Sequence, residues 1–378
     1  MPTALVTPLP TIHTAYDPLI VALQDASDPA SGREGQSQVE VQLEIEDTLG
    51  SDEWRLIGEY LNPYDYTSDE AKVTLHKALQ GALSPALPDL EAAAIQPIPG
   101  LVKNYRLKAR DVVDGDPLGE FNTTSAAKAW LAGNSYMNIG QDLLTGKAYL
   151  FLTTRPLIRR FHPLELIHLQ VLPVASGTPS LRIKATFKDG SDQTDVIALD
   201  PVTALVPFAL NVSIPAYPKP LAYLEIDLTG LTGSAEMLTY RLTDNRNPYF
   251  RQLFFRNSLG GLDHIPLTGK SEEIQDTSGE TLAAQEFPPT DAQVGNSRAY
   301  NQSATDSFIL RSGWMSKYEI NSLRDMRLRN EVYLLDGSEL RRLILANGTQ
   351  QIKKDGEFLF ALELSAQYAW SEYAYSRS

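Results

Sequence analysis

The amino-acid sequence predicts a mainly β protein, with tandem β-sandwich-like domains followed by a C-terminal β-rich module that contains one short helix. Residues 38–46 alternate strictly, with Val39, Val41, Leu43 and Ile45 on one face and polar side chains on the other. Short apolar runs recur at even spacing between turn signals in the middle of the chain. Two hydrophobic hairpin patterns flank a capped helix near the C-terminus.

Length and composition limit the possibilities. A chain of 378 residues exceeds the usual size of one domain, and we expect three, over residues 1–125, 126–235 and 236–378. The chain contains no cysteine, which excludes disulfides, thiolate metal sites and cysteine nucleophiles. Its net charge of -14 opposes nucleic-acid binding, because affinity for phosphate depends on clustered Lys and Arg.

The first residues lack a basic segment followed by an apolar core, and no apolar run approaches the length that crosses a bilayer. We therefore expect a soluble protein made without Sec export and without membrane insertion. Residues 1–14 are punctuated by prolines and should form an extended arm or an edge strand.

In the N-terminal domain, apolar residues at helical spacing predict a helix over residues 69–83, ended by two prolines. Residues 125–131 predict a short helical turn that leads into the second domain. The strands of this domain are predicted at residues 19–23, 38–46, 54–61 and 103–110. The second domain should contain strands at residues 147–154, 166–172, 180–187, 204–210 and 222–228.

Two segments could bind a metal ion. The acidic loop Asp114–Glu120 offers hard oxygens on a tight turn, as Ca²⁺ requires, but it lacks the full twelve-residue ligand pattern and is better explained as a solvated turn. His162 and His168 could share a strand face, but a site needs three or four ligands and the sequence offers no others nearby. We therefore predict no metal site.

A small basic cluster comprises Arg155, Arg159 and Arg160. It is either a solvated loop or a salt-bridged contact with an acidic neighbour. The sequence does not choose between these alternatives.

The C-terminal module should begin with a hairpin in which residues 253–259 face residues 262–267 across Gly260-Gly261. Ser316 and Glu319 have the spacing of a capping box at a helix start. Three apolar residues continue that helix on one face, and two strands about an Asp-Gly turn follow it, at residues 331–335 and 339–345. A last strand is predicted at residues 357–364.

Residues 272–305 are polar, carry two consecutive prolines and have little apolar periodicity, which predicts an extended loop. We expect this loop and the N-terminal residues to be assembly arms that neighbouring subunits order.

The chain shows no nucleophile, metal or phosphate-loop signature, so we predict no catalytic, cofactor-binding or metal-binding residues and no enzyme activity. A glycoside hydrolase would need two facing carboxylates, and nothing singles out such a pair among 47 acidic residues.

Three segments, residues 149–156, 254–263 and 331–337, resemble parts of virion structural proteins from tailed phages and prophages of Bacteroidota-type hosts. The resemblance covers about the last two thirds of the chain, and its motifs concern the fold alone. It implies a non-enzymatic structural component of a phage tail or baseplate, made in the host cytoplasm and located in the virion. Its partners would be copies of itself, in a homo-oligomer, and other virion proteins.

An alternative function is that of a β-sandwich adhesion or carbohydrate-binding protein. Such a protein needs an exposed aromatic platform, for which Trp370, Tyr373 and Tyr375 are candidates. The same residues would equally suit a packed terminus.

Overall fold

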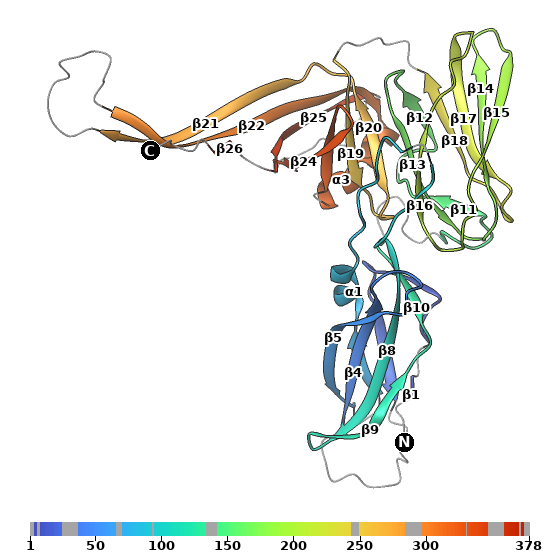
Figure 1. The fold of residues 1–378 in the computed structure, drawn as a ribbon, viewed down its shortest axis with the longest axis vertical. Coiled ribbons are helices and arrows are strands. Elements are labelled where there is room, and N and C mark those ends of the chain that lie inside the picture. The colour runs from blue at the N-terminus through green and yellow to red at the C-terminus, as the bar shows by residue number, and fades with distance from the viewer. Residues whose placement is uncertain are drawn as a thin grey trace.

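The computed structural model describes residues 4–5, 8–24, 37–65, 70–92, 94–133, 142–242, 249–283, 297–329, 331–346, 359–369 and 372–373. Over these residues the chain is mainly β, as predicted. It forms two sandwich-like domains and a C-terminal domain built on one large sheet (Figure 1). The first sandwich lies at one end of the molecule, and the other two domains lie side by side at the other end.

The first sandwich packs two sheets around a common core. One sheet has the order β1-β3-β6, with β1 (Ala4–Leu5), β3 (Ile20–Gln24) and β6 (Glu70–Thr74). The other has the order β2-β10-β8-β4-β5, with β2 (Ile12–Thr14), β10 (Ala127–Trp130), β8 (Val102–Val113), β4 (Ser37–Glu46) and β5 (Trp54–Pro63), and β9 (Asp116–Thr123) pairs with β8. The four apolar side chains predicted to point inward from β4 are fully buried.

Two predictions for the first sandwich are wrong. The helix predicted over residues 69–83 is the strand β6 followed by the short helix α1 (His76–Ala82). Ala71 and Val73 are both buried, so this part of the apolar pattern has the period of a strand. The helical turn predicted at residues 125–131 is the strand β10, which lies between β2 and β8 and buries Trp130.

The N-terminal strands pair within their own chain. β1 pairs with β3, and β2 runs parallel to β10. Both lie at the edge of a sheet, which matches the edge-strand alternative for residues 1–14. The described residues therefore give no support to an N-terminal arm that a neighbour must order.

The second sandwich contains the five predicted strands and four others. One sheet has the order β11-β13-β16-β7, with β11 (Tyr149–Phe151), β13 (Ile167–Pro173), β16 (Phe208–Val212) and β7 (Gln96–Pro97). The other has the order β12-β18-β17-β14-β15, with β12 (Ile158–Phe161), β18 (Met237–Leu242), β17 (Leu221–Thr229), β14 (Ser180–Phe187) and β15 (Asp192–Ala198). β18 lies beyond the domain boundary expected at residue 235, so this sandwich extends to Leu242.

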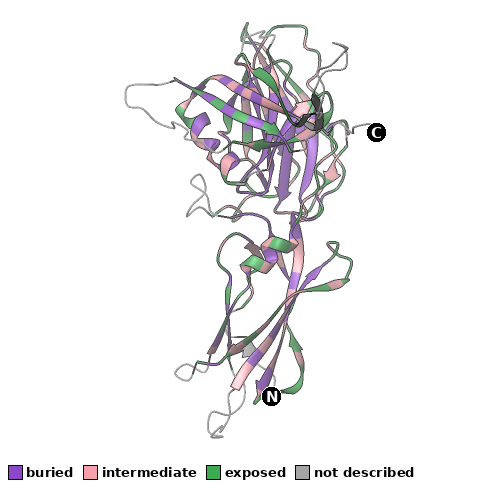
Figure 2. Ribbon diagram, turned by 90° about the vertical axis from the view of Figure 1, so that its left-hand side faces the viewer, coloured by how far each residue is buried: buried purple, intermediate pink, exposed green. Residues whose placement is uncertain are grey.

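The C-terminal domain is one sheet with the order β20-β19-β23-β24-β25-β22-β21, and the short β26 (Glu372–Tyr373) pairs with β22. Its strands are β19 (Arg251–Arg256), β20 (Leu262–Leu267), β21 (Glu272–Ala283), β22 (Ser297–Ser316), β23 (Val332–Asp336), β24 (Glu339–Leu345) and β25 (Leu359–Tyr368). The predicted capping box is present, and the helical segment forms α2 (Lys317–Ser322) and α3 (Arg324–Arg329). The predicted stripe of Ile320, Leu323 and Met326 is buried in the core beneath the sheet. Buried stretches run through the interior of the molecule (Figure 2), and β13, β19 and β20 are almost entirely buried.

The extended loop predicted at residues 272–305 is instead most of a long hairpin. β21 and β22 supply its two strands, and residues 284–296 lie outside the described residues. The loop prediction rests on the polar composition of this segment. A ribbon that is solvated on both faces has no need of apolar alternation, so its sequence resembles a loop.

Candidate functional site

The hairpin of β21 and β22 extends sideways from the body of the molecule (Figure 1). We call its residues 272–283 and 297–309 the arm. β25 supports β22 only between Ser307 and Ser316, and β26 adds two residue pairs further out. The outer part is therefore a ribbon of two strands, and the side chains at 272–275 and 277–280 are exposed. A ribbon of two strands is marginally stable by itself, so this arm depends on its base and on whatever it contacts.

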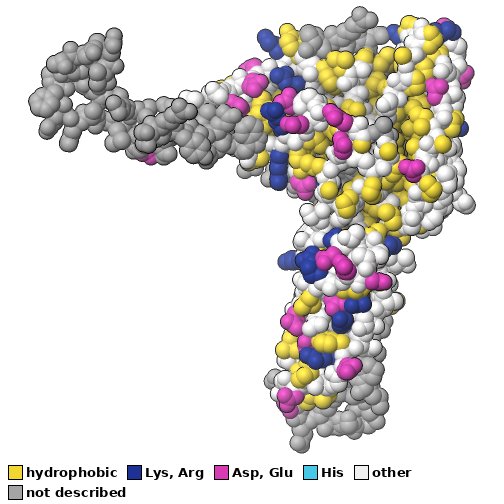
Figure 3. Space-filling view, in the orientation of Figure 1, with side chains coloured by type: hydrophobic (Ala, Val, Ile, Leu, Met, Phe, Trp, Pro, Cys, Tyr) yellow, Lys and Arg dark blue, Asp and Glu magenta, His cyan; other side chains and the backbone are white. Residues whose placement is uncertain are grey.

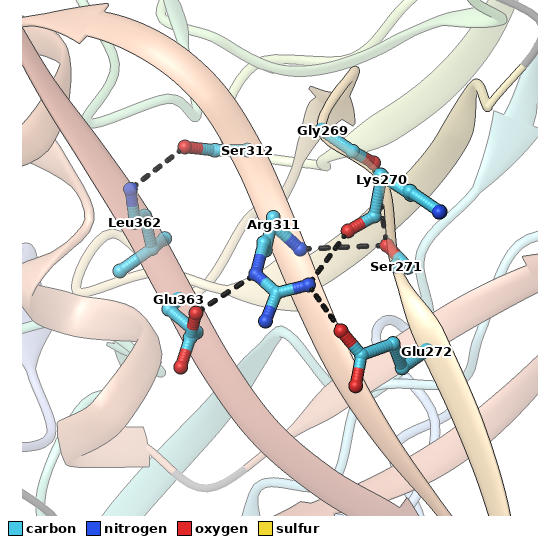
Figure 4. A network of polar contacts seen from close by, with 8 residues as sticks. All are labelled: Gly269, Lys270, Ser271, Glu272, Arg311, Ser312, Leu362 and Glu363. Atoms are coloured by element: carbon cyan, nitrogen blue, oxygen red, sulfur yellow. Dashed lines mark hydrogen bonds and ion pairs between the residues drawn. The ribbon is translucent and has the colours of Figure 1, made fainter.

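Arg311 of β22 connects the base of the arm to the sheet (Figure 4). Its Nε donates to Glu363 Oε2 of β25 at 2.8 Å, and its Nη1 donates to Glu272 Oε1 of β21 at 2.9 Å. Nη1 also donates to the Lys270 carbonyl at 3.0 Å. The hydrogen bonds to Glu272 and then to Glu363 raise the pKa of Arg311, which keeps the guanidinium charged. Since the side chain is only half-buried and its ion pairs are open to water, we expect the network to fix the direction of the arm more than to stabilise the fold.

Two glycines allow the chain that enters β21 to lie directly on β22. A Cβ on Gly269 would lie 2.6 Å from Arg311 Cβ and 2.8 Å from the Arg311 carbonyl oxygen. Gly313 has a φ of 73°, and a Cβ there would meet Thr268 Oγ1. The pairing of β22 with β25 shifts between Arg311 and Trp314, which is a bulge. Bulges bend a strand, and this one lies where β22 leaves the body for the arm.

The turn between β19 and β20 lies where all three domains meet. We call residues 257–261 the junction turn. Trp130 of the first sandwich donates its indole N–H to the Leu259 carbonyl at 3.0 Å. Asn257 donates its amide to the carbonyl of Leu152, in the second sandwich, at 2.8 Å. Leu259 itself packs in the core of the first sandwich, so one turn joins the three domains.

The glycines of the junction turn are required by close backbone contacts. Gly260 has a φ of 76°, which confirms its predicted turn conformation. A Cβ on Gly260 would meet the Leu131 carbonyl, and a Cβ on Gly261 would meet the Leu152 carbonyl. The Cβ on Gly261 would also lie 2.6 Å from Leu152 Cβ. Side chains at these two positions would therefore push the domains apart.

A buried carboxylate holds the second sandwich to the C-terminal domain. Asp263 of β20 is 3% exposed. It accepts hydrogen bonds from the Thr153 hydroxyl, from the Thr154 backbone N–H at 3.0 Å and from Asn257 Nδ2 at 2.7 Å. Several donors of this kind satisfy a buried charge, so the interface is specific as well as apolar.

The predicted basic cluster is divided by the structure. Arg155 and Arg159 are buried, at 4% and 3% exposure, so the solvated-loop alternative is wrong for both, while Arg160 is exposed. Arg155 donates Nη1 to the His264 carbonyl, and the Arg159 guanidinium lies 5.1 Å from the Tyr240 ring centroid. Burial, and then the charge of Arg159, lower the pKa of Arg155. Arg155 therefore belongs to the contact between two domains of one chain, whereas the ring contact of Arg159 lies within the second sandwich.

The two candidate histidines do not share a strand face. His162 follows β12 and stacks on Phe250, with 4.5 Å between ring centroids. His168 lies in β13, and its Nδ1 is 2.7 Å from Asn211 Oδ1. Burial lowers the pKa of His168 to about 4, and the hydrogen bond from its ring to Asn211 Oδ1 opposes part of that change. Within the described residues, no group of three His, Asp or Glu side chains is placed to hold a metal ion.

The other predicted site residues contribute little to this region. Residues 114–120 form the exposed turn between β8 and β9 and the start of β9. Trp370 and Tyr375 lie outside the described residues, and Tyr373 is described only as backbone, in β26.

An open cleft lies on the C-terminal domain near the base of the arm. Its volume is about 880 Å³. It is lined by the aromatic side chains of Tyr249, Phe250 and Tyr368 and the charged side chains of Glu273, Asp306 and Arg341. Arg341 pairs with Asp336 at 3.0 Å and lies over the Tyr368 ring. This mixture of rings and charged groups suits a polar ligand with apolar faces.

Three residues of the site were not predicted, namely Arg311, Asn257 and Asp263. Each is a polar residue inside or beside a run of apolar strand residues. A polar side chain in such a run must find partners when the strand is buried, and this is the signal that could have identified them. Their partners come from distant parts of the chain, which no local pattern contains.

No family model and no curated protein matches the chain. Among solved structures, CBD12 from CALX1.2 matches with 9% identity and a TM-score of 0.17, over 59% of this chain and 78% of that one. The full extracellular region of plexin A4 matches with 10% identity and a TM-score of 0.18, over 95% of this chain. The chain spans 39% of that plexin structure. Likeness at this level carries no argument about function.

Among the described residues, no helix is both long and apolar enough to cross a membrane.

Proposed function

We propose that this protein is a non-enzymatic structural component of a phage tail or baseplate, which acts by assembly with copies of itself and with other virion proteins. It would be made in the host cytoplasm and located in the virion. The resemblance in the sequence motivates the virion assignment. The observation that carries the assembly function is the arm.

The arm supports assembly because it presents a free strand edge. β21 is the last strand of its sheet, and its outer edge has no strand beside it among the described residues. Exposed edges pair with other chains unless something blocks them, and added strands bind through main-chain hydrogen bonds. Ile274 on this strand is 44% exposed, so the edge also offers an apolar side chain.

The body next to the arm has a surface suited to a specific polar contact. Lys, Arg, Asp and Glu side chains gather on the C-terminal domain beside the base of the arm (Figure 3). Mixed charges of this kind select the partner and its orientation more than they add affinity. We infer that a neighbouring subunit pairs with β21 and rests against this charged surface.

The assembly function is tested by shortening the arm. Residues 277–304 are replaced with an Asn-Gly turn between the paired residues Asp276 and Thr305, which keeps Glu272 and Arg311 at the base. We expect a circular dichroism spectrum typical of a folded β protein and fewer subunits per oligomer by size-exclusion chromatography with light scattering. The proposal is contradicted if the shortened chain unfolds, or if it assembles as well as the intact chain.

A matched pair of substitutions separates the arm from edge strands in general. Ile274→Lys places a charge on the edge strand β21, and Val196→Lys does the same on β15, the edge strand of the second sandwich. Lysine on an edge opposes strand addition. Assembly should fall with Ile274→Lys and persist with Val196→Lys, and equal effects would count against the arm.

The cleft favours a second candidate function, carbohydrate binding. Tyr249 is 48% exposed and lines the cleft near Asp306 and Arg341, which could hydrogen-bond sugar hydroxyls. A monomer that binds glycans and loses binding in Tyr249→Ala would support this candidate. A stable multimer without glycan binding would support assembly. A hydrolase screen with activity abolished by one Asp or Glu substitution would contradict both.

A further inference from the structure

A second and smaller pocket lies between the second sandwich and the C-terminal domain. Its volume is about 290 Å³. Arg155 and His162 line it from the second sandwich, and Ser312 lines it from β22. All three are buried, whereas the rim carries the exposed side chains of Arg160 and Trp314. Arg160 donates to the Trp314 carbonyl at 3.1 Å, which holds the two sides of the rim together.

The buried wall of this pocket contains N–H donors without acceptors. Among the described residues, the Arg155 guanidinium reaches one acceptor, the His264 carbonyl, and its Nε has none. His162 Nδ1 accepts from the Leu164 backbone N–H at 3.2 Å, so the proton of the neutral ring lies on Nε2. That Nε2 also lacks a partner. Both atoms are closed off from the open space of the pocket, so a ligand oxygen reaches them only when the two side chains turn towards the pocket. Buried donors without acceptors are costly, and a ligand that makes this contact would remove part of that cost.

The acids around the pocket accept hydrogen bonds from other donors, although Glu165 Oε1, which lies 3.2 Å from His264 Nε2, makes no hydrogen bond among the described residues. Glu319 lines the pocket, but its Oε2 accepts from the Ser316 backbone N–H and hydroxyl, both at 2.8 Å. Glu165 Oε2 accepts from the His162 backbone N–H at 3.1 Å. Asp263 is held by threonine and asparagine donors. None of these three supplies Arg155 with a close ion pair, yet their charges would repel a ligand with two negative charges.

We propose that this pocket binds a single carboxylate group, with Arg155 as its main cationic partner. The planar guanidinium matches the geometry of a carboxylate, and Arg160 adds positive charge at the entrance. The exposed ring of Trp314 supplies an apolar surface for the hydrocarbon attached to that group. The carboxylate could belong to a small organic acid or to the C-terminus of a peptide, since the recognising chemistry is the same.

The proposal is tested by titrating the full chain with hexanoate and with the neutral hexanamide, followed by isothermal calorimetry and tryptophan fluorescence. The two probes have the same hydrocarbon, and charge-assisted hydrogen bonds discriminate by about tenfold or more. We expect hexanoate to bind at least about tenfold more tightly than hexanamide. Equal binding of the two probes, or binding of neither probe, would overturn the proposal.

The residues are tested with a matched set of variants. Arg155→Met keeps much of the side-chain volume and should reduce hexanoate affinity at least about tenfold. Arg55→Met is the control, because Arg55 is an exposed arginine of the first sandwich. If Arg155→Met fails to fold, Arg160→Met replaces it, since Arg160 lies at the exposed rim. Affinity that is unchanged in a folded Arg155 variant, or in Arg160→Met when that variant is used, would overturn the proposal.

A peptide separates the two sources of the carboxylate. A tripeptide Gly-Leu-Phe with an acetylated N-terminus is compared as the free acid and as the C-terminal amide. Tighter binding of the acid than of hexanoate indicates a polypeptide ligand, and weaker binding indicates a small acid. Binding of the amide as tight as the acid would overturn the proposal. These readouts do not use oligomer mass, so their failure is distinct from failure of the arm.

Discussion

The C-terminal domain contains two hairpins of similar secondary structure and opposite surroundings. The hairpin of β19 and β20 is almost entirely buried, and its junction turn touches both other domains. The hairpin of β21 and β22 carries the arm, whose described side chains at 272–275 and 277–280 are exposed. The first hairpin meets its partners within the chain. In the second hairpin β25 and β26 pair with part of β22, whereas the outer edge of β21 has no strand beside it among the described residues.

This difference shows how one sheet can serve both folding and assembly. Backbone groups in the buried hairpin are paired within the chain, and glycines at its turn permit contacts that no larger residue allows. Backbone groups on the outer edge of the arm are open to another chain. Substitutions in the two hairpins should therefore have effects of different kinds, on the fold in one case and on assembly in the other.

The largest effect is expected at the junction turn. Gly261→Ala adds a Cβ that meets the Leu152 carbonyl and lies 2.6 Å from Leu152 Cβ, so we expect a loss of about 3 kcal/mol in the free energy of unfolding. Gly337→Ala is the control, because Gly337 has a φ of 62° but no atom within 4 Å of an added Cβ. It should cost about 1 kcal/mol. Urea unfolding measures both, and equal losses would contradict the importance of this contact.

Acid should weaken the buried hairpin before it affects the arm. His168 packs against Phe254 of β19, with 6.1 Å between ring centroids, and burial lowers the pKa of His168 from 6.5 to about 4. Between these values the unfolded chain binds more protons than the folded chain, so stability is present above pH 6.5 and is lost as the pH falls towards 4. The expected loss from His168 between pH 7 and pH 5 is about 2 kcal/mol.

The control for this prediction is His168→Gln, which keeps a hydrogen-bonding group and cannot take up a proton. The arm contains no histidine, so the protection of its backbone amides against hydrogen exchange should not follow the same pH dependence. Urea unfolding at several pH values between 7.5 and 5 should show that the free energy of unfolding changes less with pH in the variant than in the natural chain. Identical slopes would mean that His168 becomes protonated in the folded state as easily as in the unfolded state.

The sequence predicted the buried hairpin better than the arm, for a physical reason. Burial on both faces favours a continuous apolar run such as Leu253-Phe254-Phe255, and Gly260-Gly261 marked the turn between β19 and β20 correctly. The capping box at Ser316 is also local, and it was found. The arm was predicted as a loop because a solvated ribbon leaves no apolar pattern. The network around Arg311 was missed because its partners lie about 40 and 52 residues away in the chain.

A smaller effect is expected where β22 ends. Ser316 caps α2, with its hydroxyl accepting from the Glu319 N–H and its own N–H donating to Glu319. Ser316→Ala should cost about 1 kcal/mol. Glu319→Gln is the control, because glutamine also closes a capping box and should cost less. A melting curve that is unchanged in Ser316→Ala would contradict the capping role.

The smallest effect on global stability is expected at the base of the arm, although the local effect there should be clear. Arg311→Met removes donors to Glu272, to Glu363 and to the Lys270 carbonyl, which together connect β21, β22 and β25. Because this side chain is only half-buried and its ion pairs are open to water, we expect the unfolding midpoint to change little. Amide hydrogen exchange at residues 272–275 should become faster, since the arm then opens independently of the sheet.

Gln275→Met is the control within the arm. Among the described residues, the side chain of Gln275 makes one hydrogen bond, to Asp306 at 3.2 Å. Exchange that is unchanged in Arg311→Met would show that main-chain pairing alone holds the arm. A fall in global stability as large as that of Gly261→Ala would show that the two hairpins do not differ in the way proposed.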